Sequence, residues 1–234
     1  MEISLCLDAA RPWPELLELA RRSEERGLHA IYVPDHFGTY REAWTLLSAL
    51  AASTERVGLG TLVLGVTHRH VAVLREMARS LREISGGRLV LGLGAAWDEA
   101  EHRALGLTFP TPGERLDLLE SAVQQLTDTE VPLLVGGGGE RRTMPIAARH
   151  ASAWHAWAEP EDFERKCAIM DRLCREAGRE PSAVRRVTGA VLVDDDDPAA
   201  TLAAYQHAGA DEFVVRDHRR VPADESLAAL PPTT

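Results

Sequence analysis

Short apolar runs alternate with segments of helical periodicity along the whole 234-residue chain. The apolar runs, which we expect to be strands, lie at residues 3–7, 30–33, 57–64, 88–93, 131–135, 153–157, 186–193 and 212–215. The helical segments lie at residues 14–26, 42–53, 70–84, 114–126, 141–150, 160–177 and 199–207. Strands that are apolar throughout are typical of a parallel sheet that helices cover on both faces. Eight such units close most simply as a (β/α)₈ TIM barrel, and an open doubly wound sheet is the alternative.

The composition limits the kind of protein. Apolar residues make up 45% of the chain, which is ample for one buried core. No repeat, low-complexity block or linker divides the chain, so we expect a single domain over residues 1–234. The net charge of −10 argues against a nucleic-acid or anionic-membrane partner. We find no signal peptide and no apolar run of membrane-spanning length, so we expect a soluble cytoplasmic protein.

One segment indicates where a ligand binds. Residues 85–97 read SGGRLVLGLGAAW, which is the end of a helix, a short strand, and then glycine and alanine. Glycine at the end of a strand lets backbone or ligand approach closely, because it has no Cβ atom. Parallel α/β proteins bind their ligands at the carboxyl ends of the strands. The segment therefore predicts a site at this end of the barrel.

Asp35 and His36, at the end of the second expected strand, are the best acid–base candidates. A histidine gains or loses a proton near neutral pH, and a neighbouring carboxylate can orient it. The alternative is that Asp35 caps the following turn and His36 packs. For the remaining histidines we expect mainly surface or structural roles; they are His29, His68, His70, His102, His150, His207 and His218.

Four consecutive glycines, residues 136–139, follow the fifth expected strand and precede a helix. Their backbone N–H groups and the helix N-terminus suit a phosphate group. Arg141 and Arg142 could add charge-assisted hydrogen bonds, and a flexible turn is the alternative. Three tryptophans lie at or near the expected rim, where they suit a planar ring cofactor, with core packing as the alternative; they are Trp97, Trp154 and Trp157.

The sequence gives little sign of a metal site. Its histidines, cysteines and aspartates form no cluster with metal-ligand spacing. Cys167 and Cys174 lie seven residues apart on one expected helix, which favours core packing. The four aspartates at 194–197 are expected to form a solvated loop that caps the next helix, and a metal site there is the less favoured reading.

Several stretches resemble the luciferase-like monooxygenase superfamily, and most closely its oxidoreductases that use the deazaflavin coenzyme F420. The stretches are residues 30–37 (AIYVPDHF), 42–65, 84–101 (ISGGRLVLGLGAAWDEAE), 106–115 (GLTFPTPGER) and 132–154. Their order and spacing together are specific. The resemblance implies a (β/α)₈ barrel in which the cofactor ring lies across the mouth.

The resemblance also implies roles for particular residues. His36 matches a histidine that stands beside the ring and the substrate in many members. Leu62 and Val63 fall where the family often has a non-proline cis peptide behind the ring. Gly94 and Ala95 match residues under the ring, and the four glycines match the loop that holds the phosphate. The candidate cofactor-binding residues are therefore Leu62, Val63, Gly94, Ala95, Ala96, Gly136, Gly137, Gly138, Gly139 and Trp157.

The chain also departs from the family pattern. Ala95 stands where some sugar-phosphate dehydrogenases of the family carry a glutamate, so we do not transfer their activity. Arg82 stands where an aspartate is usual. The stretch between residues 126 and 131 is very short, whereas relatives insert a long segment that covers the barrel mouth. We therefore expect an open site, suited to a bulky substrate or completed by a partner chain.

The resemblance implies an oxidoreductase that transfers a hydride between F420 and a small or bulky organic substrate at a C=C, C=N or C=O group, or in reverse. His36 would supply or remove the proton and Asp35 would orient it. An FMN-dependent two-component monooxygenase and a non-catalytic flavin-binding or accessory subunit are the alternatives. We expect a homodimer with a small-molecule or peptide-like substrate, and neither a nucleic-acid nor a membrane partner.

Overall fold

The computed structural model describes residues 1–191 and 197–216 of the chain. Three of the aspartates expected in a solvated loop, residues 194–196, lie outside the described residues, as do His218 and the rest of the tail from Asp217 onward. The fourth aspartate, Asp197, is described. Its carboxylate accepts the backbone N–H groups of Ala199 and Ala200 and so caps the next helix, as expected.

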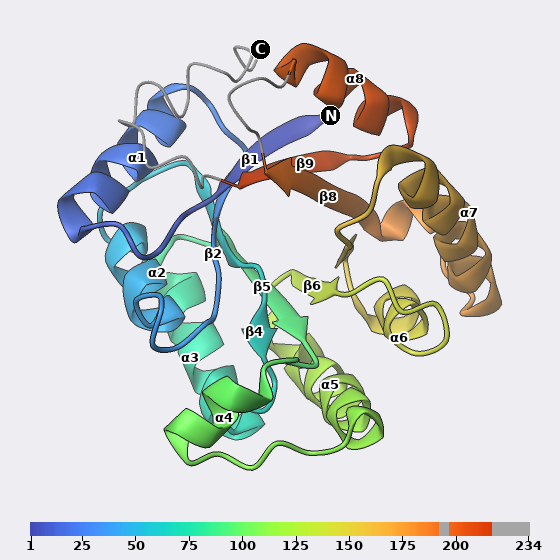
Figure 1. Cartoon of the computed structure of the whole chain (residues 1–234), viewed down its shortest axis with the longest axis horizontal. Helices are drawn as coiled ribbons and strands as arrows, with labels where there is room; N and C mark the ends of the chain where they lie inside the picture. Colours follow the sequence, from blue (N-terminus) through green and yellow to red (C-terminus); the bar gives the residue numbers. More distant parts are fainter. Residues whose placement is uncertain (192–196, 217–234) are drawn as a thin grey trace.

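Parallel strands form a closed barrel that helices surround (Figure 1). The strands are β1 (Glu2–Cys6), β2 (Ala30–Val33), β3 (Gly58–Thr61), β4 (Leu64–Gly65), β5 (Leu89–Gly94), β6 (Leu133–Gly136), β7 (Ala153–His155), β8 (Arg185–Val191) and β9 (Glu212–Arg216). They pair in the order β3-β2-β1-β9-β8-β7-β6-β5-β4, and the additional pairing of β3 with β5 closes the ring. This closure confirms the (β/α)₈ barrel and excludes the open doubly wound sheet.

The third barrel position holds two short strands instead of the one expected at residues 57–64. Both β3 and β4 pair with β5, and a cis peptide bond joins Leu62 to Val63 between them. The cis bond implied by the family resemblance is therefore confirmed. Beyond it, β4 brings Leu64 and Gly65 into register with Leu93 and Gly94 at the mouth of the barrel.

Seven of the helices match the expected ones within a few residues. The helices are α1 (Trp13–Glu25), α2 (Ala43–Ala51), α3 (Val71–Ile84), α4 (Glu99–Leu105), α5 (Pro112–Leu126), α6 (Thr143–His150), α7 (Pro160–Glu176) and α8 (Pro198–His207), with short 3₁₀ turns at Thr127–Thr129 and Pro181–Ala183. Pro145 is the third residue of α6, where a backbone N–H has no acceptor within the helix, so the proline is tolerated. None of the described helices has both the length and the apolar character needed to cross a bilayer.

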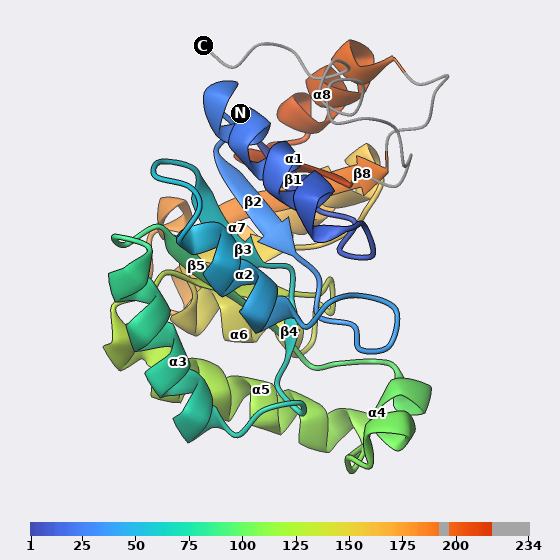
Figure 2. The ribbon, with the colours of Figure 1, turned by 90° about the vertical axis from the view of Figure 1, so that its left-hand side faces the viewer.

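Helix α4 was not expected from the sequence. It has only seven residues, follows directly on the small residues after β5, and ends at Gly106 in the left-handed conformation. Asp98 caps its first turn by accepting the backbone N–H of Glu101 at 3.0 Å. The Asp-x-x-Glu spacing is typical of a helix start and could have predicted α4. In Figure 2 the arrowheads of β1 and β8 point toward the side of the molecule on which α4 lies, so α4 belongs to the mouth of the barrel.

Two hydrophobic clusters make up the core. The larger cluster lies between the strands and the surrounding helices, and it includes Cys174 and, at its edge, Cys167. This placement confirms that these cysteines pack in the core. A smaller cluster, which includes Tyr32, Leu134 and Val214, fills the interior of the barrel. The interior is thus packed with side chains, and space for a ligand remains only toward the strand ends.

Candidate active site

A cavity of about 570 Å³ opens at the carboxyl ends of the strands. This volume lies within the range of roughly 300–1,000 Å³ that is usual for small-molecule sites. All of the site residues predicted from the sequence line the cavity except Gly139. Residues that the prediction did not include also line it, among them His68, Glu101, His155 and Arg216.

Asp35 is buried at the edge of the cavity and is held by three partners. Its two carboxylate oxygens accept hydrogen bonds from the Arg69 guanidinium at 2.9 and 3.0 Å. One of these oxygens also accepts the backbone N–H of Gly65 at 3.1 Å and lies 3.0 Å from Nδ1 of His68. Burial works to raise the pKa of Asp35, but the hydrogen bonds from His68 and Arg69 hold it below its ordinary value. Asp35 is thus a carboxylate that ties the end of β2 to β4 and to the segment before α3.

The carboxylate that orients His36 is Glu101, which corrects the expectation that Asp35 does so. Nδ1 of His36 lies 3.4 Å from Oε2 of Glu101, and Oε1 of Glu101 accepts the backbone N–H of Phe37. The Glu101 side chain is 7% exposed and that of His36 is 35% exposed. Since Nδ1 faces Glu101, Nε2 is the ring nitrogen of His36 that is left for a ligand in the cavity. Glu101 was not predicted from the sequence because helix α4, which carries it, was not.

Two further histidines, His68 and His102, pack against each other beside the cavity. The His68 side chain is 3% exposed and its ring lies 4.7 Å from that of His102. Nε2 of His102 lies 2.7 Å from the Thr67 hydroxyl, and Nδ1 lies 2.7 Å from the carbonyl oxygen of Asp98. The expected structural role fits His102, whereas His68 also lines the cavity and contacts Asp35.

The glycines at the strand ends have a structural reason that the sequence did not reveal. A Cβ atom on Gly94 would lie 2.6 Å from Cγ2 of Val63, and one on Gly136 would lie 2.8 Å from Cγ1 of Val63. The Val63 side chain therefore occupies the space that side chains at positions 94 and 136 would need. Glycine at these positions lets Val63 form part of the cavity floor, flanked by the small side chains of Ala95 and Ala96.

The glycine loop, residues 136–139, runs from β6 to the turn before α6. Gly137 has a φ of +131°, a conformation that favours glycine. Among the described residues, the backbone N–H groups of Gly138 and Gly139 have no hydrogen-bond acceptor within the chain. Arg142 pairs with Asp117 at 2.6 Å, so its guanidinium is already engaged. The ammonium group of Lys166, which was not predicted from the sequence, lies 3.0 Å from the carbonyl oxygen of Gly138.

The tryptophans divide between the rim and the core. Trp97 is 72% exposed and stands edge-on to His36 at 5.6 Å, and Trp157 is 45% exposed. Trp154, in contrast, is fully buried, stacks on Phe163 and donates its indole N–H to the carbonyl oxygen of Gly137. The prediction of a rim position is therefore confirmed for Trp97 and Trp157, and wrong for Trp154.

Two of the residues that line the cavity, His155 and Cys6, are uncharged at physiological pH. Burial, and to a lesser extent the positive charge of Arg216, lower the pKa of His155 to about 3. Its ring is therefore neutral at physiological pH, and its Nε2 atom has no hydrogen-bond partner among the described residues. Burial raises the pKa of the Cys6 thiol to about 12, so Cys6 is a neutral thiol and a poor nucleophile.

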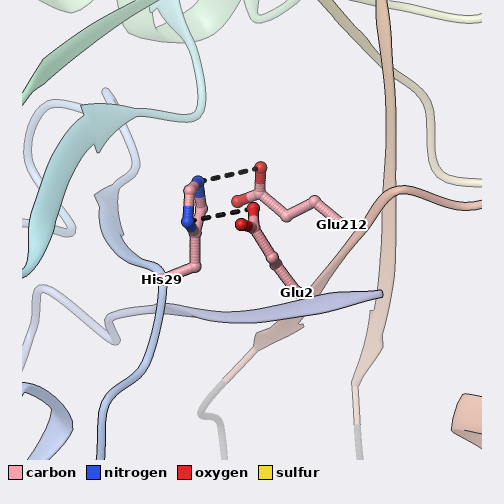
Figure 3. A group of neighbouring side chains, drawn as sticks. All are labelled: Glu2, His29 and Glu212. Carbon is pink, nitrogen blue, oxygen red and sulfur yellow. Dashed lines mark ion pairs between the residues drawn. The ribbon is translucent and has the colours of Figure 1, made fainter. Parts of the chain in front are cut away.

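At the opposite end of the barrel, Glu2, His29 and Glu212 lie close enough together to hold a metal ion (Figure 3). A guanidinium is already present there, because Arg185 pairs with Glu2 and its Nη2 atom lies 3.6 Å from Oε2 of Glu212. The Ser4 hydroxyl donates to Oε1 of Glu212 at 2.6 Å. Arg185 thus supplies the positive charge that the two carboxylates need, and we assign no metal to this cluster.

Proteins of known activity share this architecture. The chain is 26% identical over 240 residues to the 5,10-methylenetetrahydromethanopterin reductase of Methanolobus tindarius. The aligned region covers 91% of this chain and 73% of that protein. It is 33% identical over 171 residues to an F420-dependent glucose-6-phosphate dehydrogenase of Amycolatopsis mediterranei. Here the aligned region covers 58% of this chain and 50% of the relative.

A solved structure of an F420-dependent secondary alcohol dehydrogenase in complex with an F420-acetone adduct has the same fold. Its TM-score is 0.83 at 17% identity, with 98% of this chain and 99% of the other covered. The sequence profile of the luciferase-like monooxygenase family matches residues 2–130 and 119–230, which is nearly the whole chain. The chain therefore belongs to the luciferase-like monooxygenase family.

Proposed function

We propose that this protein is an oxidoreductase that uses coenzyme F420 and a small or bulky organic substrate. The observation that carries the proposal is the convergence on one cavity of a Val63 floor, the glycine loop and a histidine with one nitrogen available to a ligand. The relatives named as F420-dependent support the choice of cofactor. The relatives named 5,10-methylenetetrahydromethanopterin reductases support a carbon–nitrogen bond as one of the groups at which the proposed reaction takes place.

The residues of the cavity fit a flat ring with a phosphate-bearing tail. Glycine at positions 94 and 136 leaves room for the Val63 side chain, which a Cβ atom at either position would meet at less than 3.0 Å. The N–H groups of Gly138, which lines the cavity, and of the neighbouring Gly139 are unpaired within the described part of the chain, and they are the donors proposed for a phosphate oxygen, just before the N-terminus of α6. We propose that the cofactor-binding residues are those predicted from the sequence. F420, when bound, supplies the hydride chemistry, and the protein supplies position and electrostatics.

His36 is the proposed proton donor or acceptor. Glu101 accepts a hydrogen bond from Nδ1–H of the neutral ring, which leaves the lone pair of Nε2 directed away from Glu101. In this state Nε2 removes a proton from an alcohol substrate. In the imidazolium state the same atom donates a proton to the substrate when the reaction runs toward reduction.

Asp35 acts in this proposal as a positioning residue. Its bonds to Arg69 and to the backbone of Gly65 hold the loop after β2 against β4, so the loop presents His36 to the cavity. The short connection between α5 and β6, residues 127–132, enters the amino end of β6 and so lies away from the mouth, which corrects the expectation that its shortness opens the site. At the mouth itself, the exposed rings of Trp97 and Trp157 offer a bulky substrate apolar contact surface.

The decisive experiment is calorimetric titration of the protein with oxidised F420 and, separately, with FMN. We expect F420 to bind at least tenfold more tightly than FMN. Tighter binding of FMN would favour a two-component monooxygenase in place of the proposed reaction. Binding of neither cofactor would favour an accessory protein without catalytic activity. A single domain over residues 1–234, a homodimer and a cytoplasmic location stay predictions.

A further inference from the structure

Lys166, in the second turn of α7, lies against the glycine loop. Its Nζ atom donates to the carbonyl oxygen of Gly138 at 3.0 Å and to Oε1 of Glu140 at 3.1 Å. The side chain is only 12% exposed. A Cβ atom on Gly138 would lie 3.6 Å from this Nζ, so the ammonium stands beside a residue that lines the cavity.

The Lys166 ammonium has one N–H bond to spare. It carries three N–H donors, and among the described residues Gly138 and Glu140 accept two of them. The next acceptor, Oδ2 of Asp162, lies at 3.7 Å, which is too long for a hydrogen bond. The third donor is therefore available to an anion at the glycine loop.

Glu140 would repel such an anion if its charge were not balanced. Hydrogen bonds from Arg165 and then Lys166 lower the pKa of Glu140 to about 2, so it is a carboxylate at neutral pH. Arg165 lies 2.6 Å from Glu140 and also binds Asp162, which fixes its guanidinium. Because Arg165 stays with Glu140, Lys166 can turn its charge to a ligand without leaving the carboxylate unpaired.

We propose that Lys166 supplies the positive charge that holds the phosphate of the cofactor at the glycine loop, a role that rests on the proposed function. The sequence pointed to Arg141 and Arg142 for this task. Arg142 is bound to Asp117, and Arg141 is exposed beyond the loop.

The test compares F420 with the deazaflavin chromophore that lacks the phosphate tail. We expect Lys166→Met to weaken F420 binding at least tenfold and to leave binding of the phosphate-free chromophore unchanged within twofold. Lys166→Arg keeps the charge and should retain F420 affinity within about threefold. Arg172→Met, which removes an exposed cation of the same helix paired only with Glu176 among the described residues, is the matched control and should change neither affinity.

Salt provides a second readout, since rising ionic strength screens charge–charge attraction. The F420 affinity of the wild-type protein should fall more steeply with added NaCl than that of Lys166→Met. Equal loss of affinity for both chromophores in Lys166→Met would indicate a merely structural role and overturn the assignment. Normal F420 binding by Lys166→Met would overturn the role assigned to Lys166 and leave the proposed function standing. A wild-type protein that binds no F420 would overturn the proposed function as well.

Discussion

Charged side chains lie at both ends of the barrel, but they differ in how completely they are paired with one another. At the amino end, His29 lies between the carboxylates of Glu2 and Glu212 (Figure 3). Arg185 pairs with both carboxylates, and Glu212 also accepts a hydrogen bond from Ser4. At the carboxyl end, His36 has a single carboxylate partner within the described residues and keeps one ring nitrogen for the cavity. Charges that satisfy one another stabilise a fold, whereas groups left with spare hydrogen-bonding capacity can serve a ligand.

The cost of burial explains this division. A buried carboxylate such as Glu212, 2% exposed, is tolerated only with partners, and Ser4, His29 and Arg185 are those partners. Lys166 and the N–H groups of Gly138 and Gly139 lie near the cavity, where a ligand or solvent can complete their hydrogen bonds. We expect changes at the amino end to alter stability and changes at the mouth to alter binding and turnover. Four predictions follow in order of expected effect: the first three test this contrast, and the last concerns His155, a buried residue of the mouth that also affects stability.

His36→Ala should lower turnover with F420 by about 10²–10⁴-fold, which is the usual contribution of general acid–base catalysis. F420 affinity should change by less than threefold, because the ring of His36 holds no part of the proposed phosphate site. Steady-state rates followed by cofactor absorbance, together with calorimetric titration, separate the two quantities. Equal losses in rate and affinity would show that His36 binds the cofactor and does not move a proton.

Glu212→Ala should lower the free energy of unfolding by about 3 kcal/mol, because it removes one partner from a buried ionic cluster. Urea unfolding measures the loss. Glu2→Ala, at a half-exposed position of the same cluster, should cost less than about 1 kcal/mol. Affinity for F420 should stay at the wild-type value in both variants. A large loss of affinity without a loss of stability would contradict the proposed difference between the two ends of the barrel.

Gly137→Asp should weaken F420 binding about tenfold, which corresponds to about 1.4 kcal/mol. The new side chain would meet Thr143 at 3.0 Å, at a φ of +131° that suits glycine, and its charge would repel the phosphate. Gly113→Asp places the same charge in the first turn of α5, where an added Cβ meets nothing within 4 Å, and serves as the control. Unchanged F420 affinity in Gly137→Asp would remove the glycine loop from the site.

His155 should make the stability of the protein sensitive to mild acid. Its pKa is about 3 in the folded protein, against the ordinary value of 6.5 for a histidine in water, so between these values the unfolded chain binds a proton that the folded chain does not. Stability is therefore retained above pH 6.5 and lost as the pH falls. Between about pH 6.5 and 5.5 the free energy of unfolding should drop by about 1 kcal/mol more in the wild type than in His155→Gln. The exposed His207→Gln should follow the wild type, and parallel curves for all three proteins would contradict the assignment.

Much of the fold could be predicted from the sequence, because its signals are local. The apolar runs and the helical periodicity between them set eight strand–helix units, and the closed sheet follows from their number and parallel order. Helix α4 escaped this reasoning because seven residues are too few for a periodic pattern. The divided strand around the peptide of Leu62 and Val63 came from the family resemblance and not from any pattern in the residues.

The amino-acid sequence by itself determined the barrel, the glycine-rich strand ends, and the end of the barrel at which a ligand binds. The tertiary structure alone decided which side chains meet there. Glu101 contacts His36 across 65 positions of sequence, and Lys166 reaches Gly138 across 28. Asp35 adjoins His36 in the sequence, yet it turns to Arg69 and His68. Local patterns fix the strands and helices, but the partner of a charged group depends on which elements closure of the barrel brings side by side, and no short stretch of residues contains that information.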